Sequence, residues 1–303
     1  MFKITTYIKP LLICAIVLLS SSCVMCQIRA ISVKKTIVKE FEVTGKTVLS
    51  FQANKADIQF KSTTRKSIII TAVLSAINKE KQIAEEDLST LTVNLSRSGN
   101  IISAVNYVQL AADKSKPKSN LKVNYTVEIP STSNLAIKVN NDFGKIRSNG
   151  IRSRMAIESK YCSIELKNHN GNIKLKDNFG TIKLTAVKGD LQLKLERSNL
   201  NLTEQVGELE IKSNFSKIEL AKIQLISDAK ITDRHSEVTI LQPCLNCYSY
   251  NFNLEKSSFS FPTGITAEYV TNNETQKVGI IHNVKPSAKI FNITSTSGII
   301  TLK

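Results

Sequence analysis

The chain has 303 residues, of which 42% are hydrophobic and 22% charged, with 11 Gly and 6 Pro. These proportions are ordinary for a globular protein, and they exclude a disordered chain and a collagen-like or proline-rich polymer. Lys and Arg outnumber Asp and Glu by 41 to 25, and the formal net charge of +16 would attract nucleic acid, anionic lipid or acidic polysaccharide. The lack of Trp and the presence of only three His disfavour an aromatic sugar-binding cleft and a His-based catalytic site.

Residues 1–26 have the three-part pattern of an export signal peptide. Lys3 and Lys9 precede an apolar run from Leu11 to Leu19, and small residues follow. The run is shorter than the ~20 apolar residues that span a bilayer. The sequence therefore predicts an exported protein, and the loss of these two lysines from +16 would leave a net charge of about +14.

Two cleavage patterns compete at the end of this segment. The stretch from Leu19 to Cys23 resembles a bacterial lipobox, in which Cys23 would carry the lipid, although Ser20 stands where Leu is preferred. The stretch from Val24 to Cys26 suits ordinary cleavage before Gln27. The first pattern predicts a lipid-anchored envelope protein and the second a protein without an anchor.

The cysteines beyond this segment are Cys162, Cys244 and Cys247, too few for a disulfide scaffold in a chain of this length. Cys244 and Cys247 form a single CxxC without the second pair that a structural zinc site needs. The strand-to-helix setting of a redox motif is also missing. A local disulfide between them is the favoured interpretation, and no metal or cofactor site is predicted.

A nine-residue repeat runs from residue 137 to residue 220. Its first and third positions are apolar throughout, except at Ser148, and its other positions are rich in Gly, Asn, Asp and Ser. The apolar-x-apolar unit is strand periodicity, and the polar remainder holds a turn. The first position is occupied by Ile137, Ile146, Met155, Ile164, Ile173, Ile182, Leu191, Leu200, Leu209 and Ile218.

Alternate repeats resemble each other more closely, which predicts a structural unit of eighteen residues. Gly recurs every eighteen residues, at Gly171, Gly189 and Gly207. Phe143, Tyr161, Phe179 and Phe215 follow the same spacing, with Arg197 in the gap of the series. The predicted fold is therefore all-β: a parallel β-solenoid, or β-helix, whose ~18-residue rungs each contain two strands and two turns. The GGxGxD motif of a calcium-binding β-roll is absent, and a left-handed hexapeptide helix would need a different apolar spacing.

The rest of the chain is divided into segments before and after these repeats. Residues 27–134 are predicted to be a β-rich N-terminal cap continuous with the solenoid, with one short helix at Ile77–Leu88. Residues 135–262 are the solenoid repeats. Residues 263–303 are predicted to contain an inserted hairpin, with Asn272 and Asn273 at its turn, and a C-terminal closing rung.

Residues 33–302 resemble a known family. The segment VNYTVEIPSTSNLAIKVNNDFGKI, followed by repeats of the type NFGTIKL, is similar to the putative-adhesin β-strand-repeat family of bacterial envelope proteins. The resemblance implies an exported β-solenoid, often associated with envelope or stress-linked operons. It brings no catalytic residues with it, so function has to be argued from the residues themselves.

The outward-facing columns of the predicted solenoid offer one candidate site. Lys176, Lys194 and Lys212 share a column, which predicts a linear cationic strip that contacts a polyanion. The alternative is a charged face that only prevents aggregation. The two columns inspected contain no recurring acid pair for general acid–base catalysis, and the histidines have no Ser or Cys partner with motif support.

We therefore expect an exported, non-enzymatic protein of the bacterial cell envelope, located in the periplasm or at the outer membrane. Its solenoid would be a scaffold for adhesion or for contact with a polymer or protein. The expected partner is an anionic envelope polysaccharide or another envelope protein; nucleic acid is not expected, and membrane contact would come only through a lipid anchor. The alternatives are an exported β-helix enzyme acting on polysaccharide and an accessory protein of an envelope-stress system.

Overall fold

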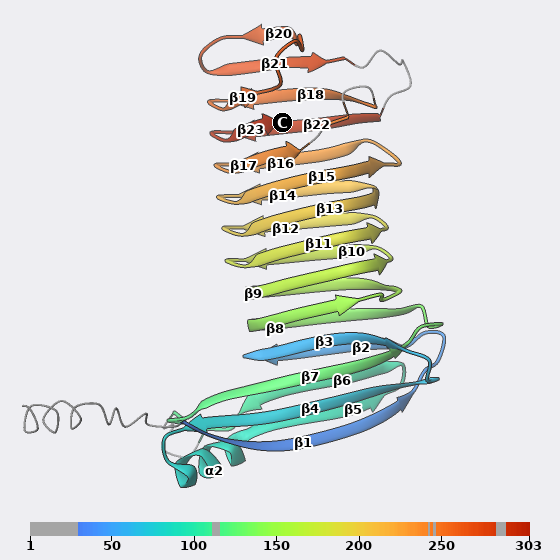
Figure 1. The fold of residues 1–303 in the computed structure, drawn as a ribbon, viewed down its shortest axis with the longest axis vertical. Coiled ribbons are helices and arrows are strands. Elements are labelled where there is room, and N and C mark those ends of the chain that lie inside the picture. The colour runs from blue at the N-terminus through green and yellow to red at the C-terminus, as the bar shows by residue number, and fades with distance from the viewer. Residues whose placement is uncertain (1–29, 111–115, 242, 245–246, 283–288) are drawn as a thin grey trace, which may run out of the picture.

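The computed structural model describes residues 30–303, apart from 111–115, 242, 245–246 and 283–288. The predicted signal peptide and Cys23 therefore lie outside the described residues. Within them, twenty-three strands and one helix form an almost entirely β structure, drawn in Figure 1 as a tall stack of strand pairs. None of the described helical residues makes a span long and apolar enough to cross a membrane.

The central part of the stack confirms the predicted β-solenoid. Each rung contributes one strand to a first sheet and one to a second sheet, and equivalent residues of successive rungs pair in parallel. Ile173 of the first sheet is opposite Leu191, and Ile182 of the second is opposite Leu200, both eighteen residues apart. The strands of these rungs are β10 (Ile173–Asn178), β11 (Thr181–Lys188), β12 (Leu191–Glu196), β13 (Asn199–Gly207), β14 (Leu209–Asn214) and β15 (Lys217–Leu225).

Two strands below this region each serve both sheets. β8 (Leu135–Asn149) and β9 (Ser153–Asn170) run through the first sheet, cross the turn and continue in the second sheet. Above the region, β16 (Ala229–Arg234) and β17 (Glu237–Leu241) form a rung with two additional residues before it, so that Ile211 is opposite Ile231. The change in repeat length therefore lengthens a turn and leaves the ladder intact.

The N-terminal cap widens the lower end of the stack. β2 (Val48–Asn54) and β3 (Ala56–Thr63) pair in parallel with the two halves of β8 and form the first rung. Below them, β5 (Leu91–Ser98) and β6 (Ile101–Val108) extend the first sheet, and β1 (Ile31–Glu42), β4 (Ser67–Asn78) and β7 (Asn120–Pro130) extend the second.

The predicted short helix is confirmed with a shift in its bounds. It is α2 (Lys81–Thr90), which lies at the lower end of the stack in Figure 1 and buries Ala84 and Leu88. The helix begins later than expected because β4 continues to Asn78, which pairs with Ile31 of β1. Ile77 and Asn78, the first residues of the predicted helix, are therefore part of strand β4.

The C-terminal strands do not lie at the end of the stack. β22 (Lys289–Thr296) and β23 (Ile299–Leu302) lie between the rung β16–β17 and the rung formed by β18 (Tyr248–Glu255) and β19 (Ser258–Ser260). The expected closing rung is thus an internal one. The stack ends instead with the hairpin β20 (Glu268–Asn272) and β21 (Gln276–Ile281), whose turn is held by the side chain of Asn273.

One apolar core runs between the two sheets, because inward residues alternate with outward polar ones along each strand. Polar side chains are also buried in a column beside one turn. Asp177 of this column accepts hydrogen bonds from the hydroxyls of Ser159 and Ser198 over 2.6 and 2.7 Å. The buried polar column consists of Asn141, Ser159, Asp177, Ser213, Asp233 and Ser295, with Leu195 between Asp177 and Ser213.

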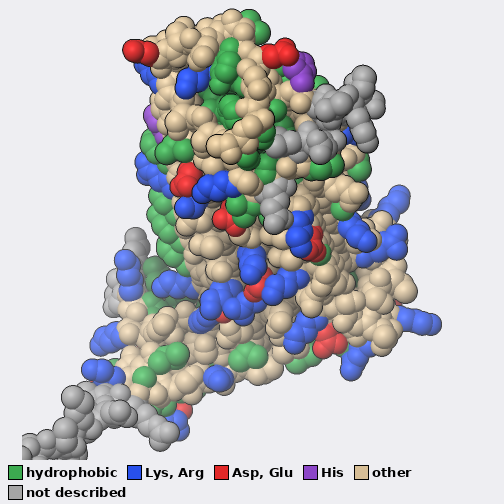
Figure 2. Space-filling model, turned by 45° about the horizontal axis from the view of Figure 1, so that its top comes forward, with side chains coloured by type: hydrophobic (Ala, Val, Ile, Leu, Met, Phe, Trp, Pro, Cys, Tyr) green, Lys and Arg blue, Asp and Glu red, His purple; other side chains and the backbone are tan. Residues whose placement is uncertain are grey.

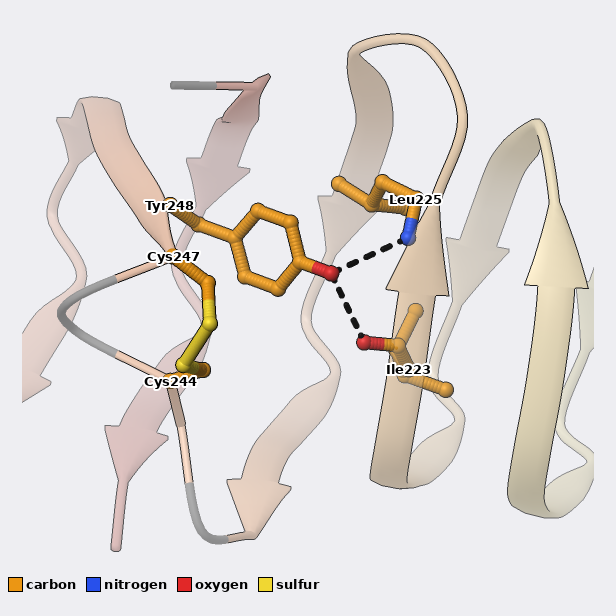
Figure 3. The surroundings of a disulfide bond; sticks show 5 residues. All are labelled: Ile223, Leu225, Cys244, Cys247 and Tyr248. Carbon is orange, nitrogen blue, oxygen red and sulfur yellow. Dashed lines mark hydrogen bonds between the residues drawn. A yellow bond between two sulfur atoms is a disulfide. The ribbon is translucent and has the colours of Figure 1, made fainter. Parts of the chain in front are cut away.

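Cys244 and Cys247 form a disulfide in the connection between β17 and β18 (Figure 3). Tyr248 follows immediately, and its buried hydroxyl accepts a hydrogen bond from the backbone N–H of Leu225 and donates one to the carbonyl of Ile223. These bonds connect the start of β18 to the end of β15 across the position of β22 in the stack.

Candidate binding surface

The predicted cationic strip is present as a straight row on the outer face of the first sheet. Lys176 is in register with Lys194, and Lys194 with Lys212, on three adjacent parallel strands. All three side chains are exposed, because their strand positions alternate with core positions. The strand spacing of ~4.8 Å sets the step between their backbones.

Two lysines of this row are ion-paired. The ammonium group of Lys176 lies 2.5 Å from a carboxylate oxygen of Glu158, and that of Lys212 lies 2.9 Å from Glu210. These hydrogen bonds and the nearby positive charges lower the pKa of both glutamates, so both stay ionised at neutral pH. Lys194 forms no ion pair with any described residue. Lys194 is therefore a cation without an ion pair among the described residues, and it lies between Lys176 and Lys212, whose charges are partly neutralised by glutamates.

A shallow open groove of about 640 Å³ adjoins the lysine row on the same face. Its floor contains the neighbouring outward column, in which Lys138, Lys174 and Lys230 alternate with smaller or acidic residues. One wall is a column of Arg154, Asn172, Asp190, Glu208 and Asp228. Basic and acidic residues balance in the groove, so the excess of positive charge on this face lies in the lysine row.

The acidic wall of the groove was not recognised in the sequence. Asp190, Glu208 and Asp228 stand one residue before the apolar pair, outside the two outward columns in which acid pairs were sought. Both carboxylate oxygens of Asp190 are engaged, one with the side-chain amide of Asn172 and the other with the backbone N–H of Glu208. Asp228 accepts a hydrogen bond from the backbone N–H of Ile290. The carboxylates of Asp190 and Asp228 therefore connect successive rungs.

The three histidines are separated in the structure. His169 is buried, its Nε2 lies 3.0 Å from the carbonyl of Ser153, and burial lowers its pKa. His235 stacks on Phe215, and His282 lies 3.1 Å from a carboxylate oxygen of Glu268. No group of three or more His, Cys, Asp or Glu able to hold a metal occurs among the described residues.

The flattened parallel β-solenoid places the chain among repeat proteins in which each rung contacts only its neighbours. Residues 47–303 match the family described as Toastrack DUF4097, and the chain belongs to that family. The match includes the solenoid and most of the N-terminal cap. No curated protein matches the chain.

Solved structures of low sequence identity are similar to this chain over most of their length. A "putative cell adhesion protein" from Clostridium sporogenes is 11% identical, with 89% of this chain and 99% of that chain covered and a TM-score of 0.25. A "putative lipid binding protein" from Parabacteroides distasonis is 10% identical, with 88% and 96% covered and a TM-score of 0.39. A "putative adhesin" from Parabacteroides merdae is 8% identical, with 89% and 96% covered and a TM-score of 0.38.

Proposed function

We propose that this chain is an exported, non-enzymatic protein of the bacterial cell envelope whose solenoid binds an anionic envelope polymer along the first sheet. The observation that carries the proposal is the row of Lys176, Lys194 and Lys212, in register on three adjacent strands. The signal-peptide pattern of residues 1–26 supports export.

The row has the geometry that a linear polyanion requires. Ammonium groups one strand apart repel each other by about 1 kcal/mol even at the dielectric constant of water, so an anionic chain lying across the strands would relieve the repulsion. Glu158 and Glu210 now provide part of that compensation. Exposed ion pairs contribute little to stability, and a polymer with closely spaced negative charges can displace them at small cost.

The first experiment is co-sedimentation of residues 27–303 with purified anionic envelope polysaccharides at low and high salt. This fragment retains every described residue. We expect binding at low salt that weakens as salt screens the charges. Replacing Lys176, Lys194 and Lys212 together by Glu should lower the affinity by at least tenfold and leave the fold intact.

A matched control exists on the second sheet. Lys167 and Lys222 are ion-paired with Glu165 and Glu204, whereas Lys183 forms no ion pair with a described residue. Their triple replacement by Glu changes the net charge equally on the opposite face. Equal loss of binding in both triple variants would show attraction by net charge alone and would contradict a specific row. Release of soluble sugar during the assay would contradict the non-enzymatic assignment.

A further inference from the structure

A second linear feature runs along the turn at which each rung passes from the first sheet to the second. Six successive rungs place one aromatic, Arg or His side chain at this turn, and each of these residues has a positive φ between 49° and 62°. Residues other than Gly rarely adopt this conformation, so its recurrence shows that the turn is built the same way each time. The aromatic ladder, as we call it, consists of Phe143, Tyr161, Phe179, Arg197, Phe215 and His235.

The side chains of the aromatic ladder stack face to face. The ring centroids of Phe143 and Tyr161 are 5.0 Å apart, and those of Tyr161 and Phe179 are 4.9 Å apart, with nearly parallel planes. The Arg197 guanidinium lies between Phe179 and Phe215, 5.6 and 5.4 Å from their centroids. His235 closes the series 4.7 Å from Phe215.

Stacking covers the ring faces but leaves the outward edges in solvent. The exposed fractions are 51% for Phe143, 50% for Tyr161, 41% for Phe179 and 50% for Phe215. Figure 2 shows hydrophobic side chains gathered in a column along the left flank of the stack. A ridge about 24 Å long results, from five steps of ~4.8 Å, with the Arg197 guanidinium within the run of apolar rings and His235 at its end. Contiguous exposed apolar surface of this kind marks an interaction site more often than scattered apolar residues do.

The geometry restricts what can bind to the ridge. Sugars and nucleobases bind aromatic residues through the ring face, and in the aromatic ladder the inner faces are already occupied. A second copy of the chain is a poor fit, because four half-exposed rings would bury only about 400 Å² per partner, where a stable interface needs ~800 Å². An apolar medium that surrounds the ring edges, such as the interfacial region of a bilayer, suits the ridge better.

The charges beside the aromatic ladder favour an anionic surface. Basic residues exceed acidic ones among its members and their outward neighbours, and two acidic neighbours are already engaged. Glu196 accepts two hydrogen bonds from the Asn214 amide and lies 3.9 Å from Arg197, and Glu237 is paired with Lys217, which leaves Lys145, Lys160 and Arg234 as the excess of basic residues over Asp142. The basic residues are Lys145, Lys160, Arg197, Lys217 and Arg234, and the acidic residues are Asp142, Glu196 and Glu237.

The chain also enters the fold at this edge. Lys55 occupies the ladder turn of the first rung, and the pairing of β3 with β7, β4 and β1 brings Lys34 to the same level across the second sheet. β1 begins at Ile31, only three residues further out on the same side. Cys23, the predicted lipid-carrying residue, stands eight residues before Ile31, which is at most about 28 Å of extended chain. A lipid at that residue would hold the ladder edge near the bilayer.

We propose that the aromatic ladder is a membrane-docking edge, which places its ring edges in the interfacial region of a bilayer containing anionic phospholipid. The Arg197 guanidinium, which lies between two rings with its Nε 3.9 Å from a carboxylate oxygen of Glu196, binds a lipid phosphate in place of that weak ion pair. The solenoid then lies with its long axis parallel to the membrane. This site is separate from the lysine row, so either can fail without the other.

Vesicle binding tests the proposal directly. Residues 27–303, which lack Cys23, are mixed with vesicles of phosphatidylcholine alone and of an equimolar mixture with phosphatidylglycerol. We expect binding to the mixed vesicles. Replacing Phe143, Phe179 and Phe215 by Asn, which tolerates positive φ, should weaken it by a factor on the order of 100, since three rings no longer leave water. Arg197→Gln should reduce the preference for the anionic vesicles.

A matched control and a site-specific probe complete the test. Replacing Val38 and Val270, two exposed valines outside the ladder, by Thr should leave vesicle binding unchanged. The chain has no Trp, so Phe179→Trp introduces a single reporter into the ladder. Its fluorescence should shift to the blue and be quenched by brominated acyl chains when the protein is bound.

Three results would overturn the proposal. The first is no binding to anionic vesicles, and the second is equal binding by the folded Asn variant. The third is a bound Phe179→Trp protein whose indole fluorescence is not quenched, because another surface would then face the lipid. Dimerisation that is lost in the Asn variant, without lipid binding, would assign the aromatic ladder to a second copy instead.

Discussion

At the residue scale, the turn that carries the aromatic ladder restricts which residue can follow each ladder member. The residue after each ladder member is Gly, Cys or Ser, because its side chain lies directly against the buried polar column. A Cβ on Gly180 would stand 2.2 Å from a carboxylate oxygen of Asp177. The same holds for Gly298, which follows Ser297 at the equivalent turn between β22 and β23 and whose Cβ would stand 2.4 Å from Asp233. This requirement is visible in the sequence as the recurring residue pairs FG, YC, RS, FS and HS. Their spacing was visible in the sequence, but the buried carboxylates beside them were not expected.

Asp233 makes stability depend on pH. One of its carboxylate oxygens accepts a hydrogen bond from Ser295, the other has no hydrogen-bond partner among the described residues, and burial raises its pKa to about 6. The folded state therefore binds the proton more tightly than the unfolded chain does. The stability that protonation adds is complete below about pH 4 and is lost as the pH rises through about 6.

Asp233→Asn should consequently stabilise the protein at pH 8, by an amount on the order of 2 kcal/mol, and much less at pH 4.5. Asn141 already occupies the same column, so the position accepts an amide. Urea unfolding at the two pH values measures the difference. As a control, Asp177→Asn should gain less, because two hydroxyl donors stabilise that carboxylate. A pH-independent effect of Asp233→Asn would contradict the account.

The opposite turn depends on glycine. Gly189 has φ +141°, and a Cβ there would stand 2.5 Å from the carbonyl oxygen of Gly171 in the preceding rung. We expect Gly189→Ala to destabilise the fold by about 3 kcal/mol, because backbone strain and a backbone clash act together. Gly45→Ala, with no atom within 4 Å of its Cβ, should change stability by less than ~1 kcal/mol. Thermal unfolding compares the two, and equal effects would show that the rung spacing is looser than described.

At the scale of elements, the solenoid was predictable and the order of its last rungs was not. The repeat specifies which residues face inward, and the eighteen-residue register follows from it. The apolar pairs Tyr250–Phe252 and Phe291–Ile293 fit the same core positions, so nothing local shows which pair stacks on β16. The structure places β22 there, with Phe291 opposite Ala229 and stacked on Tyr250. The ion pair of Lys176 with Glu158 could have been inferred from the same register, since the two residues are eighteen apart.

The inserted rung leads to a prediction about a truncated chain. Ending the chain at residue 282 removes β22 and β23, so that β16 keeps only β14 as a parallel partner and β18 loses its parallel partner. We expect amide protons of β18 and β21 to lose protection from hydrogen exchange, while those of β10 to β13 keep it, because solenoid rungs contact only their neighbours. Retained protection in β18 would mean that it can pair directly with β16, and that the insertion is not required for order above it.

At the scale of the whole molecule, two separate surfaces run along the solenoid and differ in their chemistry. The first sheet offers a row of lysines and a groove of balanced charge, and the ladder turn offers an apolar ridge. The sequence indicated the lysine row and the spacing of the ladder residues. It could not indicate how much of each ring would be exposed, because that depends on how the two sheets meet at the turn.

The most direct test of the proposed function is the salt dependence of binding to anionic envelope polysaccharide, compared between the two triple Lys→Glu variants. The account predicts low-salt binding that is lost when Lys176, Lys194 and Lys212 are replaced and kept when Lys167, Lys183 and Lys222 are replaced. Equal binding by both variants, or equal loss in both, would contradict the assignment of the lysine row as the contact surface.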